Sequence, residues 1–548
     1  MVRQFKLWCV FVLYLSLFSF LPVFSSWVEN KQGVVPVDLV LPLFLGVALS
    51  VLAASIFYPI FLKNQFVGLL VGLVTLVLVK HPKLIPIPWF SSSRVRLFFS
   101  LLPFLFLIGW ILGRWIKKGT VIEGLSKALK VSVVVAFLAG LFPVIRVIWI
   151  EWPQFFYQPR HYSFGTLSKA QEKPDIYYLV FDRYTSEEVL KSQFGFKNDL
   201  VDFLRARGFY VNPSAYAPYP RTASSISATL LADYHTEIVK NFASSSLQTE
   251  LPYYRTIQYA PVIKVFKKLG YSYYHLGSWY EATNQAPLAD DNFQKEGVIT
   301  LLGHPITLNS FVRDLISGEP ILKRFLSKGV RIKGYPIFEY LDVGECQATL
   351  EKLKELHRLA EEKPGGRLIF AHILSPHPPS CFRPDGSLKS QEEAKKLSKE
   401  TYLEQIQFLN PQIEDLVLTI QKKSQGKAII ILQADEGPYP WDYDLRFQGG
   451  VYDEKNGDMQ KWDKEALKMK YGILAAYYLP GAKKEDLVSA ADSINIFRLI
   501  FNTYFQGHLT YLPRCYYGYS LVQNRGFVFV DLSKQLTGQQ NTICQVIQ

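Results

Sequence analysis

Long apolar segments in the first 150 residues constrain this chain more than any other feature of its sequence. Five can be drawn, and most are near the length that an α-helix needs to cross a bilayer. Beyond residue 150 the sequence is polar and mixed in charge, with ordinary strand and helix patterns. We therefore expect a transmembrane helical domain at 1–150, a linker at 151–173 and a large water-exposed domain at 174–548. The five segments are Leu7–Phe24, Leu39–Leu62, Phe66–Val79, Leu97–Trp115 and Val131–Ile145.

The positive charge is divided unevenly along the chain. Of the net charge of +13, +11 belongs to residues 1–150 and +2 to the remainder. Lys and Arg residues crowd the link between the fourth and fifth segments, which favours the cytoplasmic side for that link. An odd number of spans then puts the C-terminal domain on the extracytoplasmic side of a multi-pass cell-membrane protein. Because the basic residues belong to the membrane part, nucleic acid is not an expected partner.

Two alternatives concern the membrane part. Arg3 and Lys6 before an apolar run are also typical of a cleaved signal peptide, which would leave four spans and the same location for the C-terminal domain. A transporter or channel is poorly supported, because the apolar segments hold hardly any acidic residues to line an ion path. Of the five cysteines, four lie beyond residue 345. Disulfides are therefore permitted there, in any of three pairings, but a domain of this size does not require them.

Three buried strands are predicted in the C-terminal domain. The runs Ile176–Phe181, Leu368–Leu374 and Ala428–Leu432 are apolar and rich in aromatic or branched residues. Helical patterns lie between them. Strands that alternate with helices predict an α/β fold with a mainly parallel central sheet covered on both faces. In such sheets ligands bind beyond the carboxyl ends of the strands.

Polar residues follow each of these strands and should gather at one edge of the sheet: Asp182, His377, Asp435 and Glu436. The adjacent carboxylates of Asp435 and Glu436 repel each other, and a hard divalent cation would offset that cost. Taken singly, Asp182 could be only a turn residue or helix cap, and the later pair could be solvated loop carboxylates.

Thr222 begins a predicted helix after a proline-bearing turn. Free N–H groups and the macrodipole at a helix N-terminus favour an anion, so a hydroxyl there can be activated and a phosphate held. An ordinary helix cap is the plainer interpretation of Thr222. Of two histidines around the end of the middle strand, His372 alternates into the strand and is expected in the core. His377, in a proline-rich loop, is the better functional candidate.

In their order along the chain, these features resemble the sulfatase-like catalytic domain of the alkaline phosphatase superfamily. The apolar segments ahead of an outer domain resemble, in particular, the lipoteichoic acid synthases and phosphoethanolamine transferases. The resemblance covers roughly residues 174–520. It includes the segments Pro174–Asp182, Gly208–Tyr210, His275–Trp279, Asp435–Pro438, Tyr471–Pro480 and Ile494–Arg498.

The resemblance implies roles for five residues. Asp182, Thr222 and Asp435 match metal ligands, and Thr222 also matches the nucleophile that takes up the phosphoryl group. His377 matches the position that steadies the substrate phosphate or the leaving group. Glu436 stands where the family has a metal-binding histidine, and a carboxylate there shifts the preference toward harder ions. One divalent metal ion is therefore expected, from among Mn, Zn, Mg and Ca.

The expected function is that of a membrane-anchored, metal-dependent phosphotransferase or phosphoric ester hydrolase. Its substrate would be a membrane lipid head group or an envelope glycan or polymer, attacked by Thr222 to give a phosphothreonine. A sulfatase-type ester hydrolase without formylglycine is one alternative, although the Thr222 region lacks the Cys/Ser-x-Pro-x-Arg pattern of formylglycine sulfatases. A catalytically degenerate binding module of the same fold is the other, and Glu436 in place of histidine favours it.

Overall fold

The structure is a computed structural model of the 548-residue chain. It describes residues 2–29, 36–60, 69–71, 73, 120–159, 164–168, 173–243, 249–301, 304–307, 313, 327–332, 335–440, 458–519, 529–539 and 544. The chain divides into two compact units. The first comprises Met1–Phe155 and Gly297–Leu341, and the second comprises Phe156–Glu296 and Asp342–Gln548.

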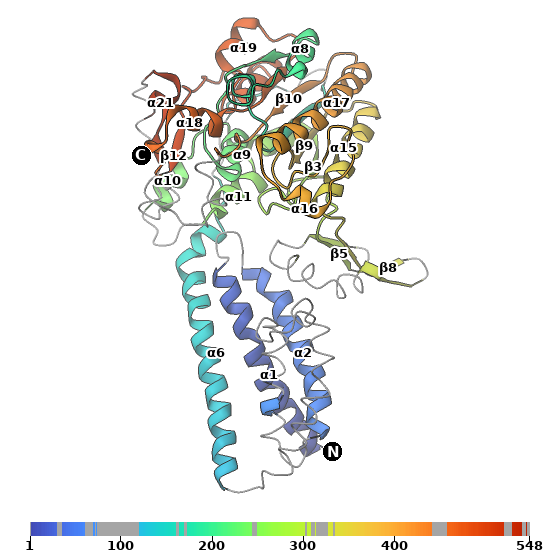
Figure 1. The fold of residues 1–548 in the computed structure, drawn as a ribbon, viewed down its shortest axis with the longest axis vertical. Helices are drawn as coiled ribbons and strands as arrows, with labels where there is room; N and C mark the ends of the chain where they lie inside the picture. The colour runs from blue at the N-terminus through green and yellow to red at the C-terminus, as the bar shows by residue number, and fades with distance from the viewer. Residues whose placement is uncertain are drawn as a thin grey trace. The chain divides into compact units, whose positions relative to one another are not determined.

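Three helices of the first unit are long and apolar enough to cross a membrane (Figure 1). They are α1 (Val2–Glu29), α2 (Val40–Ile60) and α6 (Thr120–Phe155), and α1 contacts both of the others. A short 3-10 helix, Pro36–Leu39, precedes α2. These helices coincide with the first, second and fifth predicted spans. The third predicted span lies mostly, and the fourth entirely, outside the described residues.

The first unit also contains a small antiparallel sheet with the strand order β6-β5-β8-β7. Its strands are β5 (Val298–Leu301), β6 (His304–Thr307), β7 (Val330–Ile332) and β8 (Tyr335–Leu341). These residues lie within the stretch 174–548 that the sequence suggests is one domain.

A seven-stranded sheet forms the centre of the second unit, with the strand order β2-β11-β10-β1-β9-β3-β4. Within this sheet β11 runs against the other strands, so the predicted, mainly parallel sheet is confirmed. The three strands predicted from the sequence lie together at its centre as β10, β1 and β9. The strands are β1 (Ile176–Phe181), β2 (Tyr210–Val211), β3 (Ser272–Leu276), β4 (Asp291–Phe293), β9 (Arg367–Ile373), β10 (Ile429–Gln433) and β11 (Ala475–Tyr478).

Helices surround this sheet, and every residue of β1, β9 and β10 is buried, as expected for strands covered on both faces. One group of contacting helices comprises α8 (Asp199–Ala206), α15 (Glu345–Glu361) and α17 (Lys399–Lys423). The other comprises α9 (Thr222–Leu231), α11 (Leu251–Gln258), α12 (Pro261–Lys268) and α20 (Ile496–Tyr504).

Shorter elements complete the second unit. The helices are α7 (Glu187–Phe194), α10 (Thr236–Phe242), α16 (Gln391–Ala394), the 3-10 helix Met459–Lys461, α18 (Lys464–Tyr471), α19 (Lys484–Ala490) and α21 (Ser533–Thr537). The strands β12 (Tyr517–Tyr519) and β13 (Phe529–Asp531) pair antiparallel.

The register of the three central strands brings their carboxyl ends level. Val180 of β1 pairs with His372 of β9 on one side and with Gln433 of β10 on the other. The residues that follow these positions, Asp182 and Asp435, therefore emerge at the same edge. This is the edge at which open parallel sheets bind ligands.

Two disulfides lie in the second unit. Cys346–Cys381 joins the start of α15 to the loop after β9, and Cys515–Cys544 closes the C-terminal segment. This is one of the three pairings that the sequence permits. Disulfides of this kind form and persist in oxidising compartments. Cys9, in α1, is free.

We predict that thiol labelling of the full-length chain will show these two bridges. Denatured without reductant, the protein should take up one maleimide, on Cys9, because the other four of its five cysteines are paired. After reduction it should take up five. Intact mass measurement distinguishes these products, and five adducts without reductant would contradict both bridges.

Candidate metal centre

Three side chains meet at the edge where β1, β9 and β10 end. Asp182 follows β1, His372 is the second-last residue of β9, and Asp435 lies just beyond β10. Each offers one potential ligand atom, and these atoms lie within 4.8 Å of one another. All three residues are buried. Two carboxylates and an imidazole at this spacing are a donor set that a divalent metal ion accepts.

Three buried atoms of this group have no hydrogen-bond partner: Asp182 Oδ1, His372 Nε2 and Asp435 Oδ2. Each of the three residues is at most 3% exposed. Buried polar atoms are rarely left unpaired, because each one forfeits its hydration without compensation. A cation bound among them would satisfy all three atoms at once, so the residues present fit a metal ion.

The imidazole of His372 is held in the orientation that a metal ligand needs. Its Nδ1 lies 2.8 Å from Thr283 Oγ1 and 3.2 Å from Ser278 Oγ, whereas its Nε2 lies 3.5 Å from Asp182 Oδ2. Burial lowers the pKa of His372 to about 4, so the ring is neutral at physiological pH. We assign the ring proton to Nδ1, where Thr283 accepts it, which leaves the Nε2 lone pair directed at the carboxylates.

The two carboxyl groups are electrostatically costly in the metal-free protein. Burial raises the pKa of Asp182 to about 7, although Arg183 opposes the shift. Burial also raises the pKa of Asp435 to about 7, and the charges of Asp182 and Glu436 add to the shift. Near neutral pH the site therefore tends to hold protons, which a metal ion would have to displace.

Thr222 lies on the more open side of this cluster. It is the first residue of α9, and its hydroxyl interacts with Asp435 and favours the charged form of that carboxyl. Thr222 is partly exposed, in contrast to Asp182, His372 and Asp435. The side chain of Arg221, the residue at the N-cap of α9, makes no capping hydrogen bond. A hydroxyl oxygen next to a carboxylate that could bind a metal, at a helix N-terminus, is suited to attack an anionic centre.

Glu436 has two cationic partners. Its Oε1 accepts a hydrogen bond from Arg183 Nε at 3.0 Å, and its Oε2 lies 2.8 Å from Lys470 Nζ. Burial lowers the pKa of Lys470 to about 8, against the attraction of Glu436. Glu436 therefore forms ion pairs with these two cations, and it is not part of the cluster formed by Asp182, His372 and Asp435.

The turn after β10 brings Glu436 and Lys470 together. Gly437 N donates to the carbonyl oxygen of Lys470 at 2.8 Å, near the end of α18. A Cβ at position 437 would lie 2.1 Å from the carbonyl oxygen of Met469. Glycine is therefore required for this close approach, which explains the Asp-Glu-Gly order of the turn.

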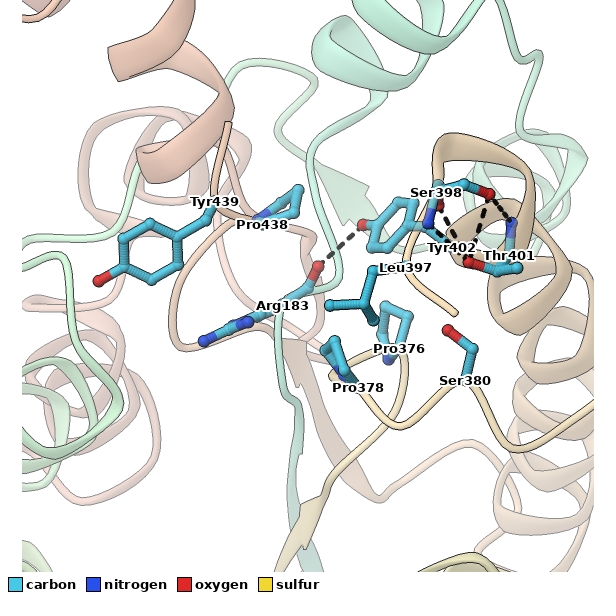
Figure 2. Close-up of a pocket in the computed structure, with 10 residues that line it drawn as sticks. All are labelled: Arg183, Pro376, Pro378, Ser380, Leu397, Ser398, Thr401, Tyr402, Pro438 and Tyr439. Carbon is cyan, nitrogen blue, oxygen red and sulfur yellow. Dashed lines mark hydrogen bonds between the residues drawn. The ribbon is translucent and has the colours of Figure 1, made fainter. Parts of the chain in front are cut away.

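Arg183 has a left-handed backbone, with φ at 65°. Its N–H donates to Asp435 Oδ1 at 3.2 Å, and its carbonyl oxygen accepts a hydrogen bond from Tyr402 at 2.8 Å. Its guanidinium lies 5.2 Å from the ring centroid of Tyr439 and points toward that ring (Figure 2). The strained turn thus directs one side chain at Glu436 while its backbone fixes Asp435.

A pocket opens beside this turn (Figure 2). It is bordered by the loop that carries His377, whose N–H donates to the carbonyl oxygen of Asp182 at 3.1 Å. The imidazole of His377 contacts the carbonyl oxygen of Pro378 and lies outside the three-residue cluster. The pocket is lined by Arg183, Pro376, Pro378, Ser380, Leu397, Ser398, Thr401, Tyr402, Pro438 and Tyr439.

Of the residues proposed from the sequence, Asp182 and Asp435 lie in the cluster and Thr222 faces it. Glu436 and His377 lie beside it with the partners described above. The sequence placed His372 in the core, and the residue is buried, but it also reaches the cluster. Its position became visible only through the pairing of Val180 with His372, which the sequence does not specify.

No protein-family model matches the sequence, and no curated protein matches it. Several solved structures resemble the chain. The C-terminal periplasmic domain of EcEptC from Escherichia coli, in complex with Zn, is 10% identical, with 68% of this chain and 97% of that chain covered and a TM-score of 0.40. The integral membrane protein lipooligosaccharide phosphoethanolamine transferase A (EptA) from Neisseria meningitidis is 13% identical, with 92% and 97% covered and a TM-score of 0.37. The C-terminal periplasmic domain of phosphoethanolamine transferase EptC from Campylobacter jejuni is 12% identical, with 63% and 97% covered and a TM-score of 0.36.

We predict that, in full-length protein in detergent, Asp435→Asn will change the response of the melting temperature to metal, whereas Glu436→Gln will change the melting temperature itself. Asp435→Asn should abolish the metal-dependent rise in melting temperature, because it removes a ligand. Glu436→Gln should keep that rise but lower the melting temperature with and without metal. It leaves Arg183 and Lys470 without their shared carboxylate, a loss of roughly 3–5 kcal/mol for a buried ion pair. Loss of metal binding in Glu436→Gln, with unchanged metal-free stability, would make Glu436 a ligand.

We also predict a pH-dependent stability difference between Asp435→Asn and the metal-free wild type. The folded-state pKa of Asp435, about 7, exceeds the ordinary value of 3.8 for this carboxyl group. Between these two pH values the folded state therefore binds more protons than the unfolded state. The titration of Asp435 thus makes the folded protein less stable as pH rises through that window. The variant should differ least from the wild type near about pH 4, and its melting temperature should exceed that of the wild type by a growing margin up to about pH 8. A difference that stays constant with pH would contradict the raised pKa.

Proposed function

We propose that this protein is a membrane-anchored, metal-dependent enzyme that transfers or hydrolyses a phosphoryl or substituted phosphoryl group through Thr222. One observation carries the proposal: the Thr222 hydroxyl, at the open N-terminus of α9, faces Asp435 of the buried Asp182–His372–Asp435 cluster. This arrangement would place a nucleophile, a metal-binding site and an anion-binding helix end close together.

The metal would be held by Asp182, His372 and Asp435, with Thr222 completing the shell. An imidazole among oxygen ligands suits zinc or manganese better than calcium, which takes oxygen ligands alone. The bound ion would lower the pKa of the Thr222 hydroxyl and offset the charge of the two carboxylates. Glu436 would contribute by fixing Arg183 and Lys470 beside the site.

The covalent step would form a bond between Thr222 Oγ1 and phosphorus, and would break the bond between phosphorus and the leaving oxygen. Asp435, which the hydroxyl faces, would take up the hydroxyl proton. The leaving oxygen would take a proton from water, with His377 on the rim steadying it. A water or alcohol acceptor would then attack the phosphothreonine and give its proton to the hydroxide left by the first step, the bond between Thr222 Oγ1 and phosphorus would break, and Asp435 would return its proton to Thr222 Oγ1.

The membrane part favours a substrate at the membrane surface. Three helices of the described residues are long and apolar enough to span a bilayer. They would confine the second unit to the membrane surface, outside the cytoplasm, where a lipid head group or an envelope glycan or polymer is within reach. A catalytically degenerate binding module remains the contrasting hypothesis, and the experiment below separates the two.

The proposal predicts a covalent adduct on Thr222. Full-length protein is incubated with membrane lipid extract and Zn²⁺ or Mn²⁺, and its tryptic peptides are analysed by mass spectrometry. A phosphoryl or head-group adduct should appear on the peptide that contains Thr222, and Thr222→Ala should abolish both adduct and turnover. Because losing a helix-end hydroxyl costs only about 1 kcal/mol, the variant should remain folded.

Ser224→Ala serves as the matched control. Ser224 is buried, and its hydroxyl donates to the carbonyl oxygen of Arg221 within the same helical turn, whereas Thr222 is partly exposed. The Ser224→Ala variant should keep the adduct. An adduct that persists on a serine in Thr222→Ala would identify a different nucleophile. A wild-type protein that neither binds metal nor forms an adduct would be the binding module.

A further inference from the structure

Arg221, the residue immediately before Thr222, is held in a fixed position at the start of α9. Its Nη1 donates to Glu250 Oε1 at 3.0 Å, and its guanidinium lies over the ring of Tyr519, 4.6 Å from the centroid. Its carbonyl oxygen accepts a hydrogen bond from Ser225 N at 2.9 Å. The side chain is 31% exposed. The cation thus has two fixed contacts, Glu250 and Tyr519, and is partly open to solvent.

In the Arg221–Glu250 ion pair, the hydrogen-bonding groups that remain unused belong to Arg221. Glu250 uses both oxygens: Oε1 accepts from Arg221, and Oε2 accepts from Tyr254 at 3.0 Å and lies 3.5 Å from the hydroxyl of Tyr280. Arg221 has five N–H donors, and among the described residues one of them is used. A ligand at this place therefore meets unused donors rather than unused acceptors, which selects an anion.

Arg221 is also linked to the candidate metal centre by two routes. Thr222, the next residue, faces Asp435. On the other side, the ring of Tyr280, whose hydroxyl approaches Glu250, lies 6.3 Å from the ring of His372. The Arg221–Glu250 pair is therefore connected to the cluster through both Thr222 and Tyr280. Arg183 also keeps unused donors, but its side chain is only 13% exposed.

We propose that Arg221 binds the non-bridging oxygens of the phosphoryl group that Thr222 attacks, and that Glu250 and Tyr519 hold its guanidinium in position. This inference rests on the proposed function and specifies how the anionic substrate is held. A planar guanidinium with several parallel N–H groups matches a tetrahedral phosphoryl group better than a point charge does. The reacting phosphorus then lies between the metal centre and the guanidinium.

The test measures binding of inorganic phosphate to full-length protein in detergent, at equal zinc content, in a Thr222→Ala background that prevents turnover. Arg221→Gln should weaken phosphate binding by about tenfold or more, because it removes a charge-assisted hydrogen bond. Arg221→Lys should recover part of the loss, since it restores the charge without the fork. The matched control is Arg205→Gln, whose arginine pairs with Glu187 on α7 and has no described contact with the site.

The control should bind phosphate as the background protein does. A purely structural role for Arg221 predicts a lower melting temperature with unchanged phosphate affinity at equal metal content, and that result would overturn the inference. Equal affinity in Arg221→Gln and Arg221→Lys would do the same. Weakened phosphate binding in this background, together with the absence of any Thr222 adduct in protein that keeps Thr222, would instead refute the covalent mechanism and leave the anion subsite standing.

Discussion

Two carboxyl groups, Asp182 and Asp435, lie buried side by side at the ends of adjacent parallel strands, and the rest of the site is arranged around their charge. The strand register fixes their proximity, so the protein cannot relieve the repulsion by moving them apart. Only a proton or a cation can offset it. The raised pKa values of Asp182 and Asp435, about 7, correspond to protonation of these carboxyl groups. The unpaired atoms of Asp182, His372 and Asp435 indicate where a cation would bind.

The third carboxylate, Glu436, follows Asp435 in the chain, but its charge is offset by cations of its own. Arg183 and Lys470 both bind it, so the three residues form a separate buried network beside the cluster. In the resembling families a histidine at this position would supply a neutral ligand. Here His372 of β9, two strands away from β10 in the sheet, places a neutral imidazole beside the two carboxyl groups. The departure from the family pattern therefore need not abolish metal binding, because the imidazole is provided by a different element.

The parts of this structure that depend on local sequence could be predicted, and the parts that depend on register could not. Apolar runs predicted β1, β9 and β10, and strand ends predicted the positions of Asp182 and Asp435. The role of His372 needed its pairing with Val180, and the partners of Glu436 needed the approach of α18. The disulfide pairing could not be predicted either, because four cysteines allow three connectivities. Arg221 was overlooked since its neighbours Glu250 and Tyr519 are distant in sequence.

The exposure of the site residues favours a covalent mechanism over direct attack by water. Asp182, His372 and Asp435 are all buried, whereas Thr222 and Arg221 are partly exposed. A substrate that approaches from solvent therefore meets the Thr222 hydroxyl and the Arg221 guanidinium before it reaches the ligands. Water activated among the buried carboxylates would have to attack past that hydroxyl. Because Thr222 is more exposed than the cluster and its hydroxyl contacts Asp435, the proposed mechanism makes that hydroxyl the nucleophile.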